Sequence, residues 1–314
     1  MMANNINPES PVVVIGAASL DIKGQLVRDF MPGTSNAASI RISAGGVARN
    51  IAENLVRLGM GASLIAAVCS DDFGQAIIQQ TEAAGVDISG VMITCEQRSA
   101  SYIAIISPNA ELLAGLDDSS AARLITPEWI DRFADRLRRA PLVLLDANLA
   151  RATVDHVLAI CEAAGVPVAF ESVAYGLATR FHERVGRFSL ITPNMLEAEA
   201  LSGMPVNDVA GAIKAAQHLV GLGTSIAVIT MAAEGAVYAT ADEVGHVPAM
   251  PTDVLDPTGA GEALAAAVIY GLVHEIPISE CVRLGVIAAT ITLRSPETVA
   301  PELSLEYIYA QLEP

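Results

Sequence analysis

The sequence predicts an α/β protein with a doubly wound, mostly parallel sheet and a second, small β-sheet. From Gly46 onward, strand-like apolar runs alternate with helical segments, which is typical of a parallel sheet covered by helices on both faces. Near residues 22–43 and again near 101–116, short half-polar runs follow one another without helices between them. These runs are expected to pair as a separate small sheet.

The predicted elements follow from local patterns taken in order. Residues 11–17 (PVVVIGA) form the short β-branched run expected of a strand buried on both faces. Alternating residues predict small-sheet strands at 22–27, 39–43, 101–107 and 111–116, with Pro-Gly, Pro-Asn and Asp-Asp turns around them. Glycines close the first helices. The predicted helices are 46–59, 72–85, 127–139, 152–165, 195–202, 209–222, 263–273, 278–293 and 305–312. The remaining predicted strands are 62–68, 142–145, 167–170, 190–191 and 225–230.

Composition narrows the class of protein. The 314 residues, 52% hydrophobic and 4% aromatic, fit one large domain spanning 1–314. The net charge of −17 argues against a nucleic-acid partner, because phosphate backbones are held by Lys and Arg clusters. No apolar run reaches the ~18 residues of a membrane helix, and the first ten residues lack a secretory pattern. The four cysteines, 69, 95, 161 and 281, have no CxxC spacing, so we expect reduced thiols and a cytoplasmic location.

The most informative stretch is Asp256-Pro-Thr-Gly-Ala-Gly-Glu262, followed by the apolar run 263–273. Small residues before a helix leave the backbone N–H groups of Gly259, Ala260 and Gly261 free to face an anion, and the helix dipole reinforces that attraction. A carboxylate at Glu262 would repel the anion unless it has a task, such as accepting a proton. The alternative is an ordinary Gly-rich turn before an acidic helix start.

The order of three motifs resembles the ribokinase-like (PfkB) carbohydrate kinases over about residues 12–308. These motifs are Gly-Gly near the N-terminus, Asn-x-x-Glu in mid-chain and Gly-Ala-Gly before a C-terminal helix. Within the family the chain is most similar to the pseudouridine kinases. The stretches that carry this similarity are Ala44–Asn54, Ser101–Ile105, Leu293–Val299 and Pro301–Ser304.

The resemblance implies that the 5′-hydroxyl of a ribosyl group attacks the γ-phosphorus of ATP, with Glu262 as base and residues 259–261 as an anion hole. Gly45 and Gly46 match positions where a sugar lies against bare backbone. Asp21 and Asn50 match positions that hydrogen-bond ribose hydroxyls. The alternatives are a strand-end turn residue for Asp21 and a polar residue in a helix's first turn for Asn50. Asn148 follows a strand at the expected crevice, where a plain turn is an equal alternative.

On the nucleotide side, Asn194 and Glu197 match the family's Asn-x-x-Glu, which organises Mg²⁺ through water. The same pair fits a helix capping box, and both roles can hold at once. Residues from Thr230 to Gly235 match an ATP-phosphate loop. Asp256 and Thr258 match a region that often binds a monovalent cation, usually K⁺.

Residues near 20–43 and 91–116 resemble the family's lid, which closes over the sugar and excludes water. In many relatives this lid also makes a dimer contact, so a homodimer through the lid is a further expectation. Tyr102 could stack on a nucleobase, although one aromatic on a strand more often packs against its neighbours.

Four positions depart from the family pattern. Glu262 stands where Asp is usual, Pro257 where Thr is usual, and Ala232 where Gly is usual. Glu171-Ser172 replaces an expected Asp-Pro. A misplacement of about 1 Å in a catalytic group can lower a rate on the order of a hundredfold.

Three functions therefore remain open. The first is an ATP- and Mg²⁺-dependent kinase of a nucleoside or sugar, with pseudouridine favoured. The second is a pseudokinase that binds a nucleoside or sugar without turnover. The third is a PfkB kinase of another substrate, such as ribose, fructose or adenosine.

Overall fold

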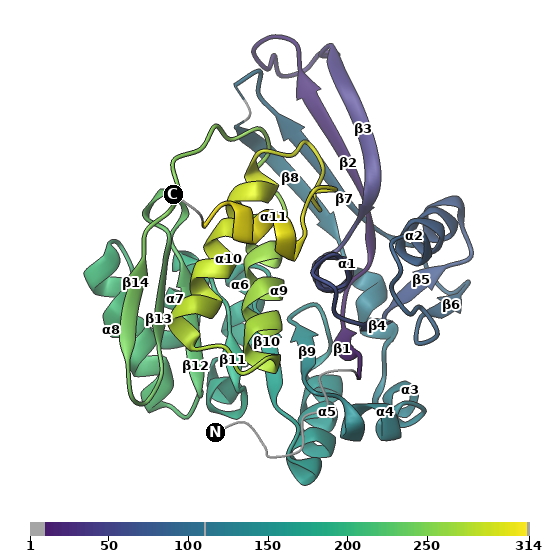
Figure 1. The fold of residues 1–314 in the computed structure, drawn as a ribbon. Helices are drawn as coiled ribbons and strands as arrows, with labels where there is room; N and C mark the ends of the chain where they lie inside the picture. Colours follow the sequence, from purple (N-terminus) through teal and green to yellow (C-terminus); the bar gives the residue numbers. More distant parts are fainter. Residues whose placement is uncertain (1–9, 110, 313–314) are drawn as a thin grey trace.

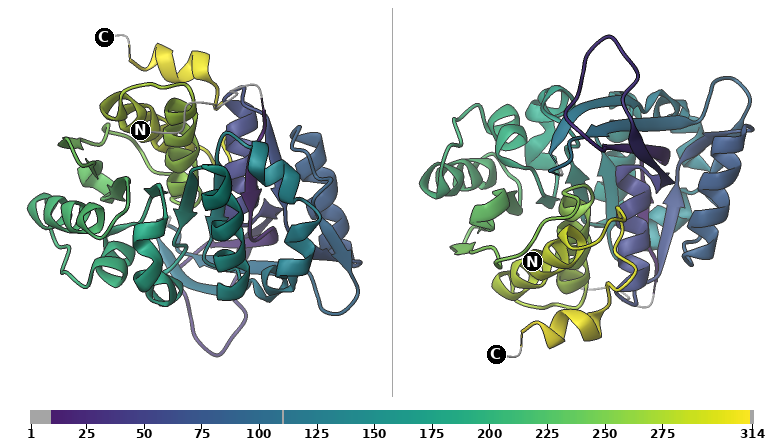
Figure 2. Two further views of the ribbon diagram at one scale, coloured as in Figure 1. Left: turned by 90° about the horizontal axis from the view of Figure 1, so that it is seen from below. Right: turned by 90° about the horizontal axis from the view of Figure 1, so that it is seen from above.

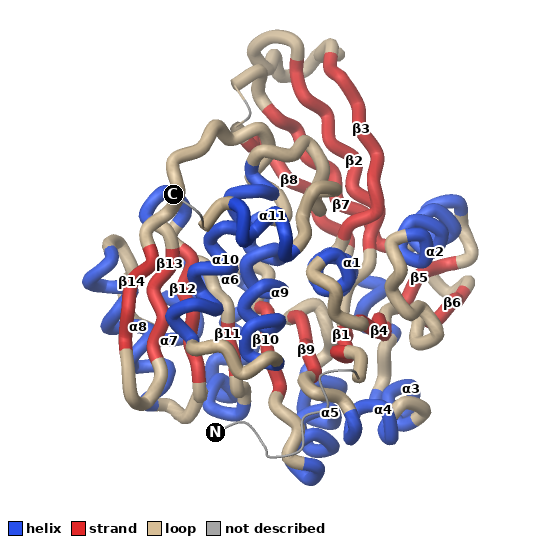
Figure 3. Tube along the Cα trace, in the orientation of Figure 1, coloured by secondary structure: helices blue, strands red, loops and turns tan. Residues whose placement is uncertain are grey.

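An eight-stranded sheet lies at the centre of the protein (Figures 1 and 3). The computed structural model describes residues 10–109 and 111–312. The strand order is β14-β13-β12-β11-β10-β9-β1-β4, parallel from β12 to β4. The strands are β1 Val12–Ile15, β4 Ala62–Ile65, β9 Val143–Asp146, β10 Val168–Glu171, β11 Leu190–Ile191, β12 Ile226–Thr230, β13 Ala236–Ala239 and β14 Val244–Val247.

Two hydrophobic cores, one on each face, hold this sheet between layers of helices. Because successive side chains of a strand point to opposite faces, Val12 and Val14 enter one core while Val13 and Ile15 enter the other. The sequence run of β1 is apolar throughout for this reason. Burying one such side chain fully contributes about 1.5–3 kcal/mol.

The helices divide between these two cores. The first core is packed by residues from α1 Val47–Arg57, α2 Asp72–Ala83, α9 Ala260–Val273, α10 Ile278–Leu293 and α11 Leu305–Ala310. The second is packed by residues from α3 Pro127–Asp131, α4 Ala134–Arg139, α5 Arg151–Ala164, α6 Tyr175–Ala178, α7 Met195–Ser202 and α8 Val209–Gly221. Short 3₁₀ helices span Ser120–Leu124, Thr179–Arg187 and Ala232–Glu234. Within the described ranges, no helix combines the length and apolar character needed to cross a bilayer.

A four-stranded sheet, here called the small sheet, projects from the core (Figures 1 and 2). Its order is β3-β2-β7-β8, from β2 Ser19–Leu26, β3 Ala38–Gly45, β7 Ala100–Ile106 and β8 Leu112–Asp118. Cross-strand register places Ile42, Ile22, Ile103 and Leu116 in one row. The row one residue away holds Ser43, Asp21, Tyr102 and Asp117. The small sheet is therefore apolar on one face and polar on the other.

The predicted fold class is confirmed, and the structure corrects four details. Strands β13 and β14 run antiparallel at the edge of the main sheet, and the sequence analysis did not anticipate them. The predicted strand 62–68 is divided, because β5 (Ala67–Cys69) leaves the main sheet to pair with β6 (Met92–Thr94). Residues 92–94 therefore lie outside the small sheet, although they fall in the segment 91–116 expected to form it. The predicted helix 127–139 is interrupted at Phe133, which has non-helical dihedral angles.

Candidate active site

Polar side chains follow the carboxyl ends of neighbouring strands in the main sheet. Asp146 ends β9, Glu171 ends β10 and Thr230 ends β12. Asn194 lies just beyond β11 and forms a bridge with Thr230, whose N–H donates to the Pro193 carbonyl at 2.9 Å. Because parallel strands end at one edge, these residues lie at the edge of the sheet where ligands bind in open α/β folds.

The first group of buried polar residues, the β2–α1 cluster, consists of Asp21, Lys23, Arg49 and Asn50. Gly46 makes this cluster possible, because it adopts a left-handed φ of +94° as the cap before α1. A Cβ at Gly46 would overlap the backbone of residues 17–19, so the start of α1 lies directly against the chain after β1. Gly45 leaves the space that the Asp21 carboxylate fills.

Asp21 is a buried carboxylate with a polar surround. Ser19 Oγ donates to Asp21 Oδ1 at 3.0 Å. Burial raises the pKa of Asp21, and the charges of Lys23 and Arg49 oppose that rise. The predicted sugar contacts Asp21, Gly45, Gly46 and Asn50 therefore come together in one place.

Arg49 is a functional candidate that the sequence analysis missed. Its guanidinium forms an ion pair with Glu53 and donates to the Ala44 carbonyl at 3.3 Å and to Asn50 Oδ1 at 3.2 Å. These contacts fix the Asn50 amide so that its Nδ2 faces Glu262. The signal was present in the sequence, since a basic residue beside Asn50 at the start of a buried helix requires partners.

The second group, the β10–α7 cluster, consists of Glu171, Ser172, Asn194 and Glu197. Asn194 and Glu197 form the predicted capping box, with Glu197 N–H donating to Asn194 Oδ1 and Asn194 N–H donating to Glu197 Oε2, each at 3.0 Å. Asn194 Nδ2 also donates to Glu197 Oε1 at 2.7 Å, and Ser172 Oγ donates to Oε2 at 2.9 Å. Ser172, at one of the departing positions, thus supports the Glu197 carboxylate.

Burial raises the pKa of both glutamates in the β10–α7 cluster. The pKa of Glu171 lies well above its usual value because the carboxyl is desolvated and faces the charge of Glu197. Thr192 Oγ1 donates to Glu171 Oε2 at 2.6 Å and opposes the rise. Desolvation also raises the pKa of Glu197.

Glu262 lies between the two clusters at the start of α9. Asn50 Nδ2 donates to Glu262 Oε1 at 3.5 Å, which joins residues 212 positions apart. Burial raises the pKa of Glu262, and the charges of Asp21 and Glu197 add to that rise. A carboxylate with a raised pKa is a stronger base at neutral pH.

The backbone before Glu262 begins α9 without a side-chain cap. Gly259 has a left-handed φ of +90° and caps α9, and its Cα lies so close to the Thr298 carbonyl that no side chain fits. Gly261 is exposed, and a Cβ placed there would meet no atom within 4 Å. The turn Gly259-Ala260-Gly261 therefore presents the N-terminus of α9 to open space.

At the predicted monovalent-cation site of Asp256 and Thr258, the Asp256 carboxylate is paired within the protein. Lys23 Nζ lies 2.7 Å from Asp256 Oδ2, and the backbone N–H of Thr258 donates to Oδ1 at 2.8 Å. Both carboxylate oxygens thus already have partners, one of which is a cation. The Lys23 side chain, which the sequence analysis missed, also donates to Thr298 Oγ1 at 2.9 Å.

Two other predicted positions have mainly local contacts. Asn148 is buried, and its N–H donates to Asp146 Oδ1 at 2.9 Å, as in the turn offered as its alternative. The other Asp146 oxygen accepts from the Ala17 N–H at 2.8 Å, and burial raises the pKa of Asp146 to about 6. Gly235 ends the 3₁₀ turn 232–234 after β12.

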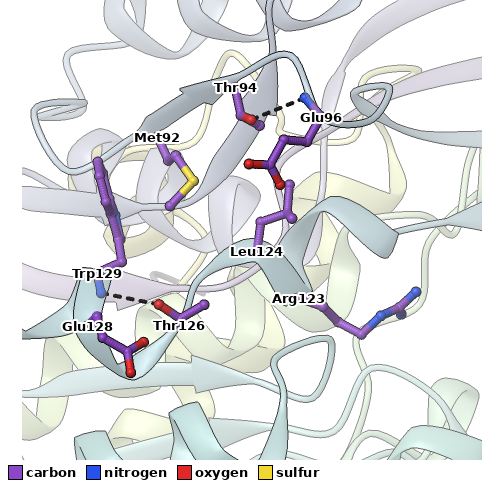
Figure 4. Close-up of a pocket in the computed structure, with 8 residues that line it drawn as sticks. All are labelled: Met92, Thr94, Glu96, Arg123, Leu124, Thr126, Glu128 and Trp129. Carbon is purple, nitrogen blue, oxygen red and sulfur yellow. Dashed lines mark hydrogen bonds between the residues drawn. The ribbon is translucent and has the colours of Figure 1, made fainter.

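A surface pocket lies elsewhere, between β6 and the segment before α3 (Figure 4). It has a volume of about 380 Å³ and is lined by Met92, Leu124 and Trp129 with charged residues at its rim. None of the predicted site residues lines it. Among the described residues, no group of three or more His, Cys, Asp or Glu side chains is arranged to hold a metal ion.

Comparison with known proteins identifies the family of this chain. The pfkB carbohydrate kinase family matches residues 10–304. A pseudouridine kinase of Escherichia coli is 30% identical over 96% of this chain and 96% of its own. A guanosine-inosine kinase of Exiguobacterium acetylicum is 26% identical over 93% of this chain and 97% of its own.

Solved structures show the same fold. A ribokinase II of Escherichia coli, in complex with ATP and Mg²⁺, superposes with a TM-score of 0.83 at 18% identity, covering 96% of this chain and 99% of its own. The family match over residues 10–304 and the 30% identity with a pseudouridine kinase establish the family. The chain belongs to the pfkB family of carbohydrate kinases and is a kinase of sugars or nucleosides.

Proposed function

We propose that this kinase transfers the γ-phosphoryl group of ATP to the 5′-hydroxyl of a nucleoside, with pseudouridine as the favoured substrate. The observation that carries the proposal is Glu262, a half-buried carboxylate in the first turn of α9 that accepts a hydrogen bond from Asn50. The 30% identity with a pseudouridine kinase supports the choice of substrate. The guanosine-inosine kinase among the relatives favours a purine nucleoside as the second candidate.

In this proposal Asp21 and Asn50 hold the sugar hydroxyls against Gly45 and Gly46. The 5′-oxygen attacks the γ-phosphorus, the bond from phosphorus to the ADP oxygen breaks, and the hydroxyl proton passes to a Glu262 carboxylate oxygen. The N–H groups of residues 259–261 stabilise the charge on the transferred group.

The β10–α7 cluster is proposed to serve the nucleotide. Both oxygens of Glu197 accept hydrogen bonds from the protein, so Glu197 fits a Mg²⁺ ion held through water better than one bound directly. When bound, Mg²⁺ neutralises phosphate charge. The loop proposed to face the phosphates begins at Thr230 and ends at Gly235. The cytoplasmic location stays a prediction.

The test is ADP release with ATP and Mg²⁺ over a panel of pseudouridine, uridine, guanosine, adenosine, ribose, deoxyribose and fructose. We expect the largest kcat/KM with pseudouridine. A larger kcat/KM with another member would reassign the substrate and leave the kinase chemistry intact. Binding of a nucleoside, without ADP release from ATP with any member of the panel, would favour the pseudokinase alternative.

We propose further that the small sheet acts as a lid and also joins two copies of the chain. What supports the second role is the apolar row of the small sheet, where Ile42 and Leu116 are about 60% exposed. Replacing Ile42 by Lys places a charge on this face and is expected to convert a dimer into a monomer, as sedimentation velocity would measure. The control is Leu222→Lys, which changes an exposed residue at the C-terminal end of α8. A wild-type monomer at all concentrations would refute the pairing.

A further inference from the structure

Lys23 is one of only two lysines in the chain, and it lies where an ammonium group is costly unless paired. Its side chain is 6% exposed and that of its partner Asp256 is 7% exposed, which makes this a buried ion pair. It joins the small sheet to the loop before α9, across 233 residues of sequence.

The contacts of Lys23 converge on the base of the anion site. Its Nζ reaches Asp256 Oδ2 at 2.7 Å and Thr298 Oγ1 at 2.9 Å. The Thr298 carbonyl lies directly against Gly259, which caps α9. The ammonium group therefore ties together the two chain segments that fix the position of Gly259, Ala260 and Gly261.

Asp256 is the carboxylate expected, from family resemblance, to bind a monovalent cation. A buried carboxylate requires a compensating positive charge, and here that charge is a covalent part of the protein. The remaining oxygen, Oδ1, is held by the Thr258 N–H at 2.8 Å. Each oxygen of the Asp256 carboxylate thus has a partner within the protein, and one of these partners supplies the compensating positive charge.

We propose that the Lys23 ammonium takes the place of a monovalent cation in this kinase, so that phosphoryl transfer is independent of K⁺. Lys23 is a positioning residue, because it acts through Asp256 and Thr298 and not on the substrate. It lies on the same face of β2 as Asp21, two residues away. The strand proposed to contact the sugar therefore also carries the cation that organises the anion site.

The first test uses the unmodified protein. ADP release and the melting temperature are measured in KCl and in tetramethylammonium chloride at equal ionic strength, with ATP supplied as an organic-cation salt. We expect kcat to change less than about twofold and the melting temperature to stay constant, since an ion that does not bind the native state does not stabilise it. Activation by K⁺ of about tenfold or more, or a melting temperature raised by K⁺, would overturn the proposal.

The second test is Lys23→Met, which leaves Asp256 buried without its cation. In tetramethylammonium chloride, kcat is expected to fall at least about tenfold with little change in KM, because the anion site is disordered. K⁺ should restore part of kcat and raise the melting temperature of this variant. Loss of kcat without recovery in K⁺ would show that Lys23 does something other than replace an ion.

Two further variants keep the result interpretable. Lys23→Met combined with Asp256→Asn removes both charges, so it is expected to fold even where the single variant does not, and to gain nothing from K⁺. A gain from K⁺ in this double variant would contradict the proposal. Lys214→Met removes the other lysine, exposed on α8, and serves as the matched control.

The activity readout rests on the proposed kinase function, whereas the melting readout does not. If no substrate in the panel is phosphorylated, the melting temperatures of the wild type and of Lys23→Met still decide the question. An unchanged wild type together with a variant stabilised by K⁺ would support the inference, and any other pair of results would refute it.

Discussion

The β2–α1 cluster and the β10–α7 cluster lie on either side of Glu262, and they balance charge in different ways. The β2–α1 cluster contains Lys23 and Arg49, the only buried cations in the described part of the chain. The β10–α7 cluster holds Glu171 and Glu197 with hydroxyl and amide donors alone. The carboxylates of the β2–α1 side are therefore neutralised by cations of the protein, while the β10–α7 side keeps an excess of buried carboxyl groups.

This difference matches the division of labour in the proposed reaction. Neutral sugar hydroxyls require acceptors and donors that are already fixed, which the ion-paired cluster supplies. The side proposed for the nucleotide leaves room for charge brought by a metal ion. Three of the four departures from the family pattern, Glu171-Ser172, Ala232 and Glu262, lie on or next to this second side.

The largest effect is expected where the two clusters meet. Replacing Glu262 by Gln keeps the hydrogen bond with Asn50 but removes the base, so kcat is expected to fall by about 10²–10⁴-fold. ADP release measures this, and a thermal shift with the nucleoside shows that the pocket is intact. Glu262→Asp tests the length of the side chain alone, because aspartate keeps the carboxylate on a side chain shorter by one methylene. Full activity in Glu262→Gln would remove the proton role from this residue.

Two alanine substitutions separate the structural from the catalytic part of the anion site. Gly261→Ala adds a methyl group to open space, so the free energy of unfolding should change by less than about 1 kcal/mol while kcat falls at least about tenfold. Gly259→Ala requires a left-handed alanine that overlaps Thr298, so it should lower the free energy of unfolding by more than about 2 kcal/mol. Chemical denaturation of both variants, beside ADP release, measures the contrast. Equal destabilisation would refute it.

The charge imbalance predicts a pH dependence of stability. A carboxyl whose pKa is raised in the folded state, as that of Glu171 is, holds its proton at a pH where the unfolded chain has lost it. The destabilisation by this carboxyl is absent below the pKa that a glutamate has in the unfolded chain, near 4. Above that pH the destabilisation grows by about 1.4 kcal/mol per pH unit until the pKa of the folded state is reached.

Replacing Glu171 by Gln should therefore raise the free energy of unfolding by an amount that increases with pH above about 4. Asp21→Asn should show a smaller increase, because Lys23 and Arg49 already favour the charged form of Asp21. Urea denaturation at a series of pH values gives both curves. A larger pH-dependent gain from Asp21→Asn would reverse the comparison of the two clusters.

The smallest effect concerns Ala232, which keeps a left-handed φ of +48° where the family has glycine. Such a conformation costs an alanine about 1–2 kcal/mol. Glycine would remove this strain, but it loses more chain entropy on folding, which offsets part of the gain. Ala232→Gly is therefore expected to raise the free energy of unfolding by about 0.5–1 kcal/mol. Ala233→Gly, in the same turn without positive φ, should not stabilise. Calorimetry of the pair measures the difference.

The sequence predicted the fold class because periodicity is local, and local patterns survive folding. Apolar runs indicated the strands of the main sheet, and the small-residue turn before 263–273 indicated the start of α9. The sequence did not reveal β13 and β14, since the residues Ala236–Ala239 carry no alternation that separates a strand from a buried turn. The helix break at Phe133 likewise has no proline or glycine to mark it.

The candidate site was predicted residue by residue but not as a network. Asp21, Asn50, Asn194, Glu197 and Glu262 were identified from motifs, and the structure brings the first four near Glu262 at the start of α9. The contacts that neutralise charge join residues 233 and 275 positions apart, as Lys23 does with Asp256 and Thr298. Such pairs depend on how the small sheet lies on the core, which no local pattern specifies.

The buried position of Lys23 also makes the protein a reporter of its own conformation. With only two lysine side chains, an amine-reactive reagent has two side-chain targets: Lys214, which is exposed, and Lys23, which is buried where β2 of the small sheet meets the loop before α9. Lys214 reacts at a constant rate and calibrates the reagent. The labelling rate of Lys23 then measures how often the small sheet separates from the core. A fall in this rate on adding a nucleoside measures the shift toward the closed conformation.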